Sequence, residues 1–461
     1  KEMNTISIDQ STNRASDKGV DKLFIRDGNM NLLQNYRGEK RINQPVLLEA
    51  IKFLLVVAFW VGASFGAGLV APLAAVTLTP ILLKPFGLPQ FILDFAAATA
   101  PLAAVLTFVP VNAMFLVLLE RKLLALLTTR LGPNRVGPNG LLQTFADALK
   151  LLFKEDIVPA KADKVLFFLA PALFFMPSVI VFMPILSVAS NGVGPFAATA
   201  FPSSLLFVMA VSSLGIMGLV MAGWASNNKY SLLGGLRSTA QAISYELPLI
   251  LCIVSLVLLV GSLDLREIAN AQANGIWTWN VFAAGDLGNP ANYQSPLKAT
   301  FLFIQFLLSP LLLFIIYFCS LAEVNRTPFD LPEAESELVS GFNTEFSGMK
   351  FALFFLAEYT NLFIASAILA ILFLGGQYFG IPAIDTFFSS ILTATPIGNL
   401  SWLFGCFILL MKVYLLIALA IWIRATLPRF RADQLMSLAW KVLIPISLVS
   451  ILVAAICKVF V

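Results

Sequence analysis

The chain has 461 residues, of which 59% are hydrophobic and 12% charged, with a formal net charge of +4 and no histidine. Soluble domains carry roughly 25% charged residues, so a chain this apolar cannot cover its surface in water and must face lipid. The near-neutral charge argues against nucleic-acid binding, and the absence of histidine removes the commonest haem, zinc and non-haem iron ligand.

The first 90 residues divide into two parts. Segment 1–45 is polar and mixed in charge, without the apolar core of a signal peptide, and we interpret it as a soluble extension that contacts a partner or is partly disordered. Segment 46–90 is hydrophobic, with a long run at 51–83 that glycines and prolines interrupt. This run predicts an extra span, either one tilted or kinked helix or a re-entrant pair.

The remainder, 91–461, is predicted to be the main membrane domain. A helix needs about 20 apolar residues to cross a hydrocarbon core. Runs of this length lie near 93–119, 165–189, 203–225, 240–262, 299–321, 351–374, 402–424 and 438–461. Together with the run at 51–83, they predict an all-α, polytopic membrane helix bundle of nine spans.

The connecting segments differ in charge between the two sides. Basic residues crowd segment 120–164 and recur in 225–239 and 424–441, whereas loops 190–202 and 375–401 hold no Lys or Arg and the remaining loop on their side, 263–298, has Arg266 and Lys298. The positive-inside rule places the basic segments on the cytoplasmic side, or on the matrix side of a mitochondrial membrane.

Segment 120–164 also contains an amphipathic stretch. Apolar residues recur at helical spacing over 141–153, while Asp147, Lys150 and Lys154 take the other face. The pattern predicts an interfacial helix that follows a Gly- and Pro-rich turn. Such a helix could form the mouth of a cavity for a lipid-soluble ligand, or it could simply rest on the bilayer.

Segment 322–350 breaks the basic pattern of its side. Its six carboxylates face only Arg326 and Lys350, and they are Glu323, Asp330, Glu333, Glu335, Glu337 and Glu345. An acidic loop beside basic ones indicates chemistry or docking, although a solvated charged loop would have the same composition.

Ionisable residues are also predicted at membrane depth: Glu246, Glu358 and Lys412. A charge in hydrocarbon costs roughly 2.5–3.5 kcal/mol, so these residues mark function by default. Burial disfavours the charged forms of both carboxyl and amine groups, which lets them exchange protons. The set suits a proton path, and the alternative is a structural ion pair such as Lys412 with Glu358.

The four cysteines lie in apolar runs and none is paired with another at metal-ligand spacing; they are Cys252, Cys319, Cys406 and Cys457. We interpret them as small buried hydrophobic side chains. We therefore expect no metal and no redox centre in this chain, so any electrons would come from a partner.

Long motifs make the chain similar to a known family. They are ERK at 120–122, GPNRVGPNGLLQTFADALKLLFKED at 132–156, GWASNNKYSLLGGLRSTAQAISYE at 223–246, AEVNRTPFDLPEAESELVSGFNTEFSGMKFALFFLAEYTN at 322–361 and WIRATLPRFRADQLMSLAWK at 422–441. With these strings, about 90–461 closely resembles a membrane subunit of NADH dehydrogenase (complex I), which is numbered 1 in the mitochondrial enzyme and lettered H in the bacterial one.

The resemblance implies a bundle of eight family spans, to which this chain adds its N-terminal segments. It implies the membrane half of a quinone tunnel, under a hydrophilic arm with the terminal iron–sulfur cluster, and a carboxylate path that couples quinone reduction to proton translocation. Quinone would be the substrate, while FMN, the iron–sulfur clusters and NADH would be bound by partner subunits. Further expected partners are small membrane subunits and antiporter-like pumps. The expected location is an energy-transducing membrane, either a bacterial plasma membrane or a mitochondrial inner membrane.

The resemblance also implies roles for individual residues. Positions at or near the quinone site are matched by Arg121, Arg130, Asp147, Phe329, Asp330, Glu333 and Glu335. Positions of the proton path are matched by Glu246, Glu323, Glu337, Glu345, Glu358 and Lys412. Basic positions on the same side are matched by Arg237, Arg424 and Arg431.

Other functions fit parts of the sequence. A sister subunit of a ferredoxin-dependent or hydrogenase-linked energy-converting complex would keep the fold and change the partner. A stand-alone ion transporter would be expected to show an inverted repeat, and the sequence contains no convincing one. A passive membrane anchor has no reason to carry Glu246 and Glu358 at membrane depth.

Overall fold

The computed structural model describes residues 90–130, 132–189, 201–282, 296–331, 340–393 and 401–460. The predicted soluble extension 1–45 and the extra span at 51–83 lie outside these residues. Three of the predicted site residues, Glu333, Glu335 and Glu337, also lie outside them.

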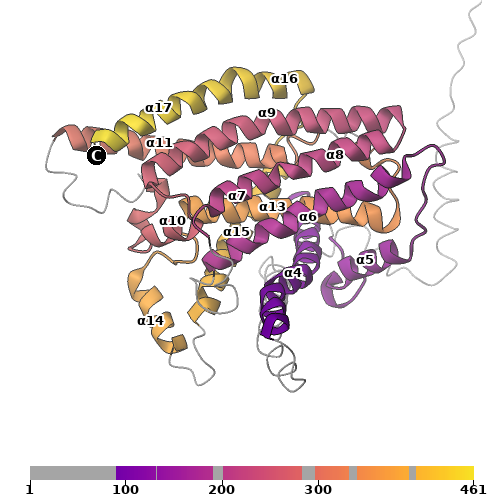
Figure 1. Ribbon diagram of the computed structural model, residues 1–461, viewed down its shortest axis with the longest axis horizontal. Helices are drawn as coiled ribbons and strands as arrows, with labels where there is room; N and C mark the ends of the chain where they lie inside the picture. Colours follow the sequence, from indigo (N-terminus) through magenta and orange to yellow (C-terminus); the bar gives the residue numbers. More distant parts are fainter. Residues whose placement is uncertain are drawn as a thin grey trace, which may run out of the picture. The chain divides into compact units, whose positions relative to one another are not determined.

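The described part of the chain is built from helices (Figure 1). The long ones are α4 (Gln90–Leu127), α6 (Lys164–Ala189), α9 (Lys229–Val260), α11 (Pro296–Glu323), α13 (Gly348–Phe373), α15 (Ser401–Thr426) and α17 (Ile444–Phe460). The shorter ones are α5 (Gln143–Phe153), α7 (Ser204–Ser212), α8 (Leu214–Ala225), α10 (Leu265–Ala271), α14 (Pro382–Thr393) and α16 (Ala432–Leu438). Helices satisfy most of their backbone hydrogen bonds internally, as lipid demands of apolar segments of this length.

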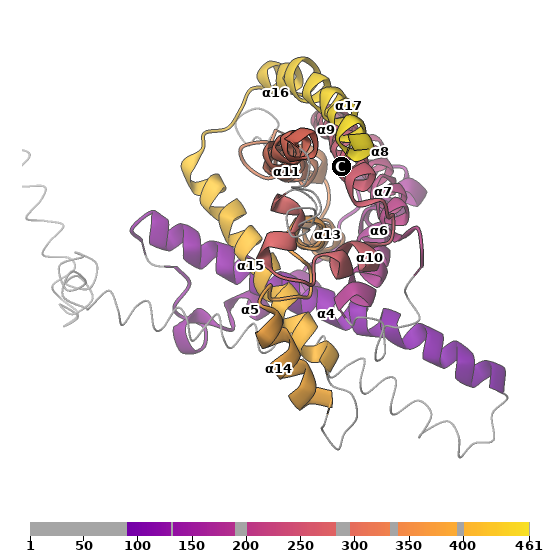
Figure 2. The same ribbon diagram turned by 90° about the vertical axis from the view of Figure 1, so that its left-hand side faces the viewer.

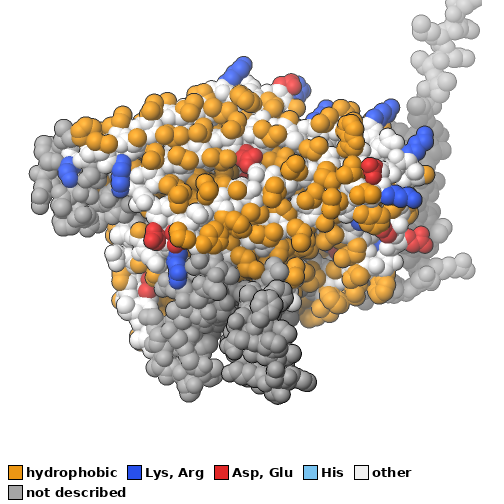
Figure 3. Space-filling view, viewed as in Figure 1, with side chains coloured by type: hydrophobic (Ala, Val, Ile, Leu, Met, Phe, Trp, Pro, Cys, Tyr) orange, Lys and Arg blue, Asp and Glu red, His pale blue; other side chains and the backbone are white. Residues whose placement is uncertain are grey.

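Within the described residues, seven helical stretches are long and apolar enough to cross a membrane. They correspond to seven of the eight spans predicted in 91–461, and the eighth, 93–119, falls within α4. The prediction of an all-α polytopic membrane bundle is therefore confirmed. Hydrophobic side chains cover most of the middle of the face drawn in Figure 3.

The prediction of a loop over 225–239 is wrong. Helix α9 begins at Lys229, and only Ser226–Asn228 separates it from α8. The Asn228 side chain caps the new start by accepting a hydrogen bond from the Tyr230 backbone N–H at 3.0 Å. The first turns of α9 are polar, which lowered their hydropathy, but Ser231 and Ser238 are fully buried between elements. Hydropathy cannot distinguish a polar side chain buried in protein from one in water.

Helix α13 lies in the middle of the bundle, between α6, α11 and α15 (Figure 2). Its apolar stretch is the most buried of the seven, with 78% of it inside the protein. Elsewhere α6 packs on α8, and α9 packs on α11 and α17. A charged residue on α13 therefore faces other protein elements rather than lipid.

The amphipathic helix predicted over 141–153 is confirmed as α5. Thr144 is buried, whereas Phe145 is 50% and Phe153 87% exposed. Lys122 Nζ of α4 donates a 2.5 Å hydrogen bond to the Asn139 carbonyl in the turn before α5. The helix is thus fastened to α4 through its preceding turn while its apolar face remains uncovered.

The described parts of segment 322–350 fold into the bundle instead of extending into solvent. Phe329 is fully buried, with its ring centre 4.6 Å from that of Phe318 and 5.6 Å from that of Tyr245. Gln241 Nε2 of α9 donates to the Phe329 carbonyl at 2.7 Å. Farther along, Phe342 is 1% exposed. A solvated charged loop is therefore excluded for these parts.

Candidate functional site

A buried charged cluster forms where four elements meet at one end of the bundle. Glu120, in the last turns of α4, is 5% exposed. Its carboxylate pairs with Arg326 at 3.2 Å and with Arg424, and it accepts a 2.7 Å hydrogen bond from the Tyr359 hydroxyl. The Arg326 guanidinium also lies 4.1 Å from the centre of the Tyr359 ring. Glu120 and Arg424 lie near the ends of apolar helices and Arg326 just beyond the end of α11, whereas Tyr359 lies within α13.

The cluster borders a cavity of about 290 Å³. The polar side chains that line it are Glu120, Arg121, Asn325, Arg326, Thr327, Asp330, Glu358, Tyr359 and Arg424. Glu358 and Asp330 are each 8% exposed. The cavity therefore combines fixed positive and negative groups, and two of its carboxylates are buried.

Two further ion pairs lie around this cavity. Arg429 Nη2 contacts Asp330 Oδ2 at 2.9 Å. Arg121 Nη1 contacts Asp147 Oδ2 of α5 at 2.6 Å, and both side chains are more than one-third exposed. The second pair joins the cavity rim to the amphipathic helix.

This arrangement can hold a small polar group that carries oxygen acceptors. Guanidinium and phenol groups donate hydrogen bonds, and hydrogen bonds from charged donors are roughly twice as strong as neutral ones. Donors fixed in place before a reaction stabilise negative charge that develops on such oxygens. The neighbouring carboxylates are positioned to exchange protons with the same group.

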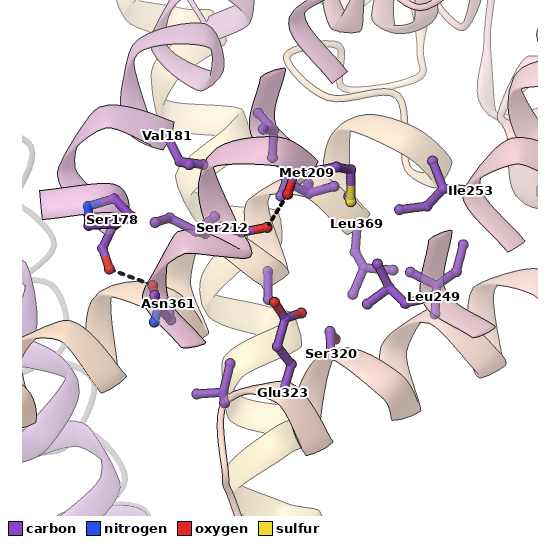
Figure 4. A pocket seen from close by; sticks show the side chains of 18 of the residues that line it. Ser178, Val181, Met209, Ser212, Leu249, Ile253, Ser320, Glu323, Asn361 and Leu369 are labelled. Carbon is purple, nitrogen blue, oxygen red and sulfur yellow. Dashed lines mark hydrogen bonds between the residues drawn. The ribbon is translucent and has the colours of Figure 1, made fainter. Parts of the chain in front are cut away.

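A second, more enclosed pocket of about 70 Å³ lies deeper in the bundle (Figure 4). The Glu323 carboxylate, at the end of α11, points into it. Across the pocket the Ser178 hydroxyl donates a 2.7 Å hydrogen bond to Asn361 Oδ1. One water needs roughly 10–15 Å³ of such space, so the pocket has room for a few.

The two cavities adjoin along the chain. Glu358 borders the first, and Asn361, about 4.5 Å farther along α13, borders the second. Glu323 lies close enough to Glu246 of α9 for their charges to interact. Glu345 lies elsewhere on the polar side, where its Oε1 accepts a 2.7 Å hydrogen bond from Asn228 Nδ2.

The structure therefore separates the predicted site residues into groups. Arg121, Asp330 and Glu358 share the first cavity, and Asp147 joins its rim. Phe329 is not among the residues that line that cavity but packs against aromatic rings such as that of Phe430, and Arg130 is exposed.

Lys412 lies far from these carboxylates. Its ammonium donates to the backbone carbonyls of Leu374, Gly376 and Tyr378, beyond the end of α13, and lies 4.6 Å from the Trp279 ring centre. Lys412 and Arg424 are twelve residues apart on α15, or about 18 Å along its axis. This geometry therefore excludes the alternative interpretation, in which Lys412 forms an ion pair with Glu358.

Sequence reasoning missed the centre of the cluster. In the sequence, Glu120 is visible only as the end of an apolar run, and Tyr359 only as the neighbour of Glu358. The available signal was the abrupt change from apolar to charged residues in the ERK motif at 120–122. The pairing itself joins positions 206 and 304 residues apart, which no local pattern encodes.

Three of the cysteines, Cys252, Cys319 and Cys457, are buried, and Cys406 is half-buried. This agrees with their interpretation as small hydrophobic side chains. Within the described ranges, no group of three or more acidic or cysteine side chains is arranged to hold a metal ion.

Comparisons with known proteins identify the family. The family model of NADH dehydrogenase matches residues 100–455. The chain is 42% identical over 365 residues to the H subunit of NADH-quinone oxidoreductase from Rhodospirillum centenum, covering 78% of this chain and 93% of the relative. It is 45% identical over 365 residues to the H subunit from Brevibacillus brevis, covering 78% and 91%.

A third relative, the H subunit of NADH-quinone oxidoreductase from Geobacillus kaustophilus, is 42% identical over 378 residues, covering 81% of this chain and 96% of its own length. These matches span nearly the whole of each relative, and the family match includes every element that borders the charged cavity. The chain therefore belongs to the NADH dehydrogenase family, among the H-type membrane subunits of NADH-quinone oxidoreductase.

Proposed function

We propose that this chain supplies the membrane half of the quinone site in a proton-translocating NADH:quinone oxidoreductase. The enzyme would lie in an energy-transducing membrane, either a bacterial plasma membrane or a mitochondrial inner membrane. The observation that carries the proposal is the 290 Å³ cavity, where Glu120, Arg326, Arg424 and Tyr359 meet beside Glu358. The names of the relatives favour quinone over a hydrogenase or ferredoxin partner.

The quinone headgroup carries two carbonyl oxygens and takes up two electrons and two protons to become a quinol. The electrons come from the partner subunits that bind FMN and the iron–sulfur clusters. In this cavity, Arg424 would donate a hydrogen bond to a headgroup oxygen, and the guanidinium groups would offset the negative charge that reduction creates. The Tyr359 hydroxyl, which donates to Glu120, would hold that carboxylate in place. Among the carboxylates of the cavity, Glu358 would supply protons, since Glu120 and Asp330 are ion-paired with arginines.

The carboxylates also provide a route by which quinone reduction drives proton translocation. Like charges close together cannot all ionise cheaply, so a change at Glu358 alters the ionisation of its neighbours. The small pocket of Glu323, with room for water, continues the route towards Glu246. Glu345, and Glu337 outside the described residues, would begin it on the polar side. From Glu246 the route would pass sideways to pumping subunits.

The quinone part of the proposal is tested by substitution of Arg424 in the purified complex. Arg424→Gln should raise the KM for quinone and lower kcat, because it removes one charged donor from the cavity; each such hydrogen bond contributes about 1.5–3 kcal/mol. Lys164→Gln, an exposed lysine at the start of α6, is the matched control and should leave both constants unchanged. Unaltered quinone kinetics in Arg424→Gln would contradict the assignment.

The proton path is tested with Glu246→Gln and Glu358→Gln in proteoliposomes. Each substitution keeps the size of the side chain and removes its exchangeable proton. Either variant should assemble normally, yet lose proton pumping or quinone reductase activity. Full pumping and full turnover in both would exclude these carboxylates from the path.

A further inference from the structure

The segment that follows α5 is fastened to the beginning of α13 by a charged pair. Lys350 Nζ, on a side chain that is 8% exposed, lies 2.9 Å from Asp156 Oδ2. The same ammonium lies 3.6 Å from the ring centre of Phe168 and 4.9 Å from that of Phe167, both on α6. Aromatic faces attract cations, so the rings and the carboxylate together hold the ammonium in place.

Neutral contacts reinforce this fastening. Ser347 Oγ accepts a 2.9 Å hydrogen bond from the Ile157 backbone N–H and donates one of 3.3 Å to the Glu155 carbonyl. Gly348, with φ +57°, comes so close that a Cβ atom there would lie 3.1 Å from the Lys154 carbonyl oxygen. Residues 154–157 are thus held against the start of α13 at several points.

Segment 154–157 connects α5, which reaches the cavity rim, to α13, which carries Glu358. On its N-terminal side, α5 carries Asp147, the partner of Arg121 on the rim. On the α13 side, Glu345 precedes the fastening and Glu358 follows it, two to three turns into the helix. Helix α5 is therefore held at one end by α4 and at the other by α13.

We propose that Asp156 and Lys350 form a positioning pair, which fixes α5 against α13 and thereby sets how readily a long-tailed quinone enters the cavity. This inference rests on the proposed quinone site. The exposed apolar face of α5, with Phe145 and Phe153, is where an apolar tail would pass. The contacts at both ends of α5 fix its position relative to α4 and α13.

The test uses the assembled complex and two quinones, one with a ten-isoprenoid tail and one with a single isoprenoid unit. Lys350→Met keeps the alkyl stem among the phenyl rings and removes the charge. The KM for the long-tailed quinone should rise about three- to tenfold, with kcat changed by less than about twofold. The KM for the short-tailed quinone should change less, and hydrogen exchange over 143–157 should become faster.

Matched variants separate the pair from its surroundings. Asp156→Asn should produce the same changes, and the double variant should be no worse than either single one, because both remove the same interaction. Lys350→Arg, which keeps the charge, should stay near wild type. Lys154→Met removes an exposed lysine close by and should change neither the KM nor the exchange.

A contact that only stabilises the fold would lower the yield of complex and leave the KM of the assembled fraction unchanged. Faster exchange without a change in KM would therefore overturn the proposal, as would unchanged exchange or additive effects in the double variant. If Lys350→Met does not assemble, Asp156→Asn on the half-exposed partner makes the same test. Failure of the quinone site itself would be distinct, because Arg424→Gln would then keep normal quinone kinetics while α5 still loosened in Lys350→Met.

Discussion

At the residue scale, the charged cluster converges on Glu120. This carboxylate is 5% exposed and meets Arg326, Arg424 and the hydroxyl of Tyr359. Removing one partner of a buried ion pair costs about 3–5 kcal/mol, because the remaining charges are left without compensation. Each member of the cluster therefore contributes to the stability of the others.

Glu120→Gln should leave two guanidinium groups without their counter-ion and lower both the thermal stability of the complex and its kcat/KM for quinone, the latter at least about tenfold. Tyr359→Phe is the milder partner variant, because it removes one neutral donor and leaves the charges balanced. Thermal inactivation and quinone reductase assays on the same preparations measure both effects. Wild-type behaviour of Glu120→Gln in both assays would refute the role of this cluster.

Lys412 is a separate case, since its ammonium is occupied by the carbonyls of Leu374, Gly376 and Tyr378. Lys412→Met would leave these acceptors without their donor, and each buried group left unsatisfied costs about 1–3 kcal/mol. We expect lower thermal stability with an unchanged KM for quinone. Proton pumping in proteoliposomes is the deciding measurement: loss of pumping at normal stability would support the predicted place of Lys412 in the proton path.

At the scale of the elements, the close contact between α6 and α8 depends on the glycine at position 218, which has no side chain. A Cβ atom at Gly218 would lie 2.8 Å from the Phe174 backbone nitrogen, whereas one at Gly215 would meet nothing closer than 3.8 Å. Both positions are helical and buried on α8. They form a natural matched pair for measuring how tightly the two helices must approach.

Gly218→Ala should destabilise the complex by about 1–3 kcal/mol, because overpacking forces the helices apart. Gly215→Ala should be neutral or slightly stabilising, since alanine is favoured over glycine in helices by about 1 kcal/mol. The fraction of complex that survives heating gives the comparison. Equal stability of the two variants would show that the close approach is not required.

The elements themselves were largely predictable from hydropathy, but their polar parts were not. The start of α9 was missed because polar residues such as Ser231 and Ser238 made it look like a loop, although both are buried. The cluster around Glu120 was missed because its partners lie hundreds of residues away along the chain. A local hydropathy pattern indicates whether a helix lies in lipid or water, but it does not predict which polar groups meet inside the bundle.

At the scale of the whole molecule, several contacts bring the predicted basic side together at one end of the bundle. The Asp163 N–H donates to the Ala225 carbonyl, which places the start of α6 beside the end of α8. Asn228 donates a hydrogen bond to Glu345, and Arg424 forms an ion pair with Glu120. The segments predicted from charge to share a side therefore do meet, and the charged cavity lies at that end.

The central claim is that this cavity receives the quinone headgroup. The most direct measurement is photolabelling of the purified complex with a quinone that carries an azido group on its ring, followed by peptide mapping of this chain. We predict label within 117–124, 325–330 or 355–359, suppressed by excess unmodified quinone and weakened by Arg424→Gln. Label confined to other parts of the chain or to partner subunits, with these three stretches unlabelled, would contradict it.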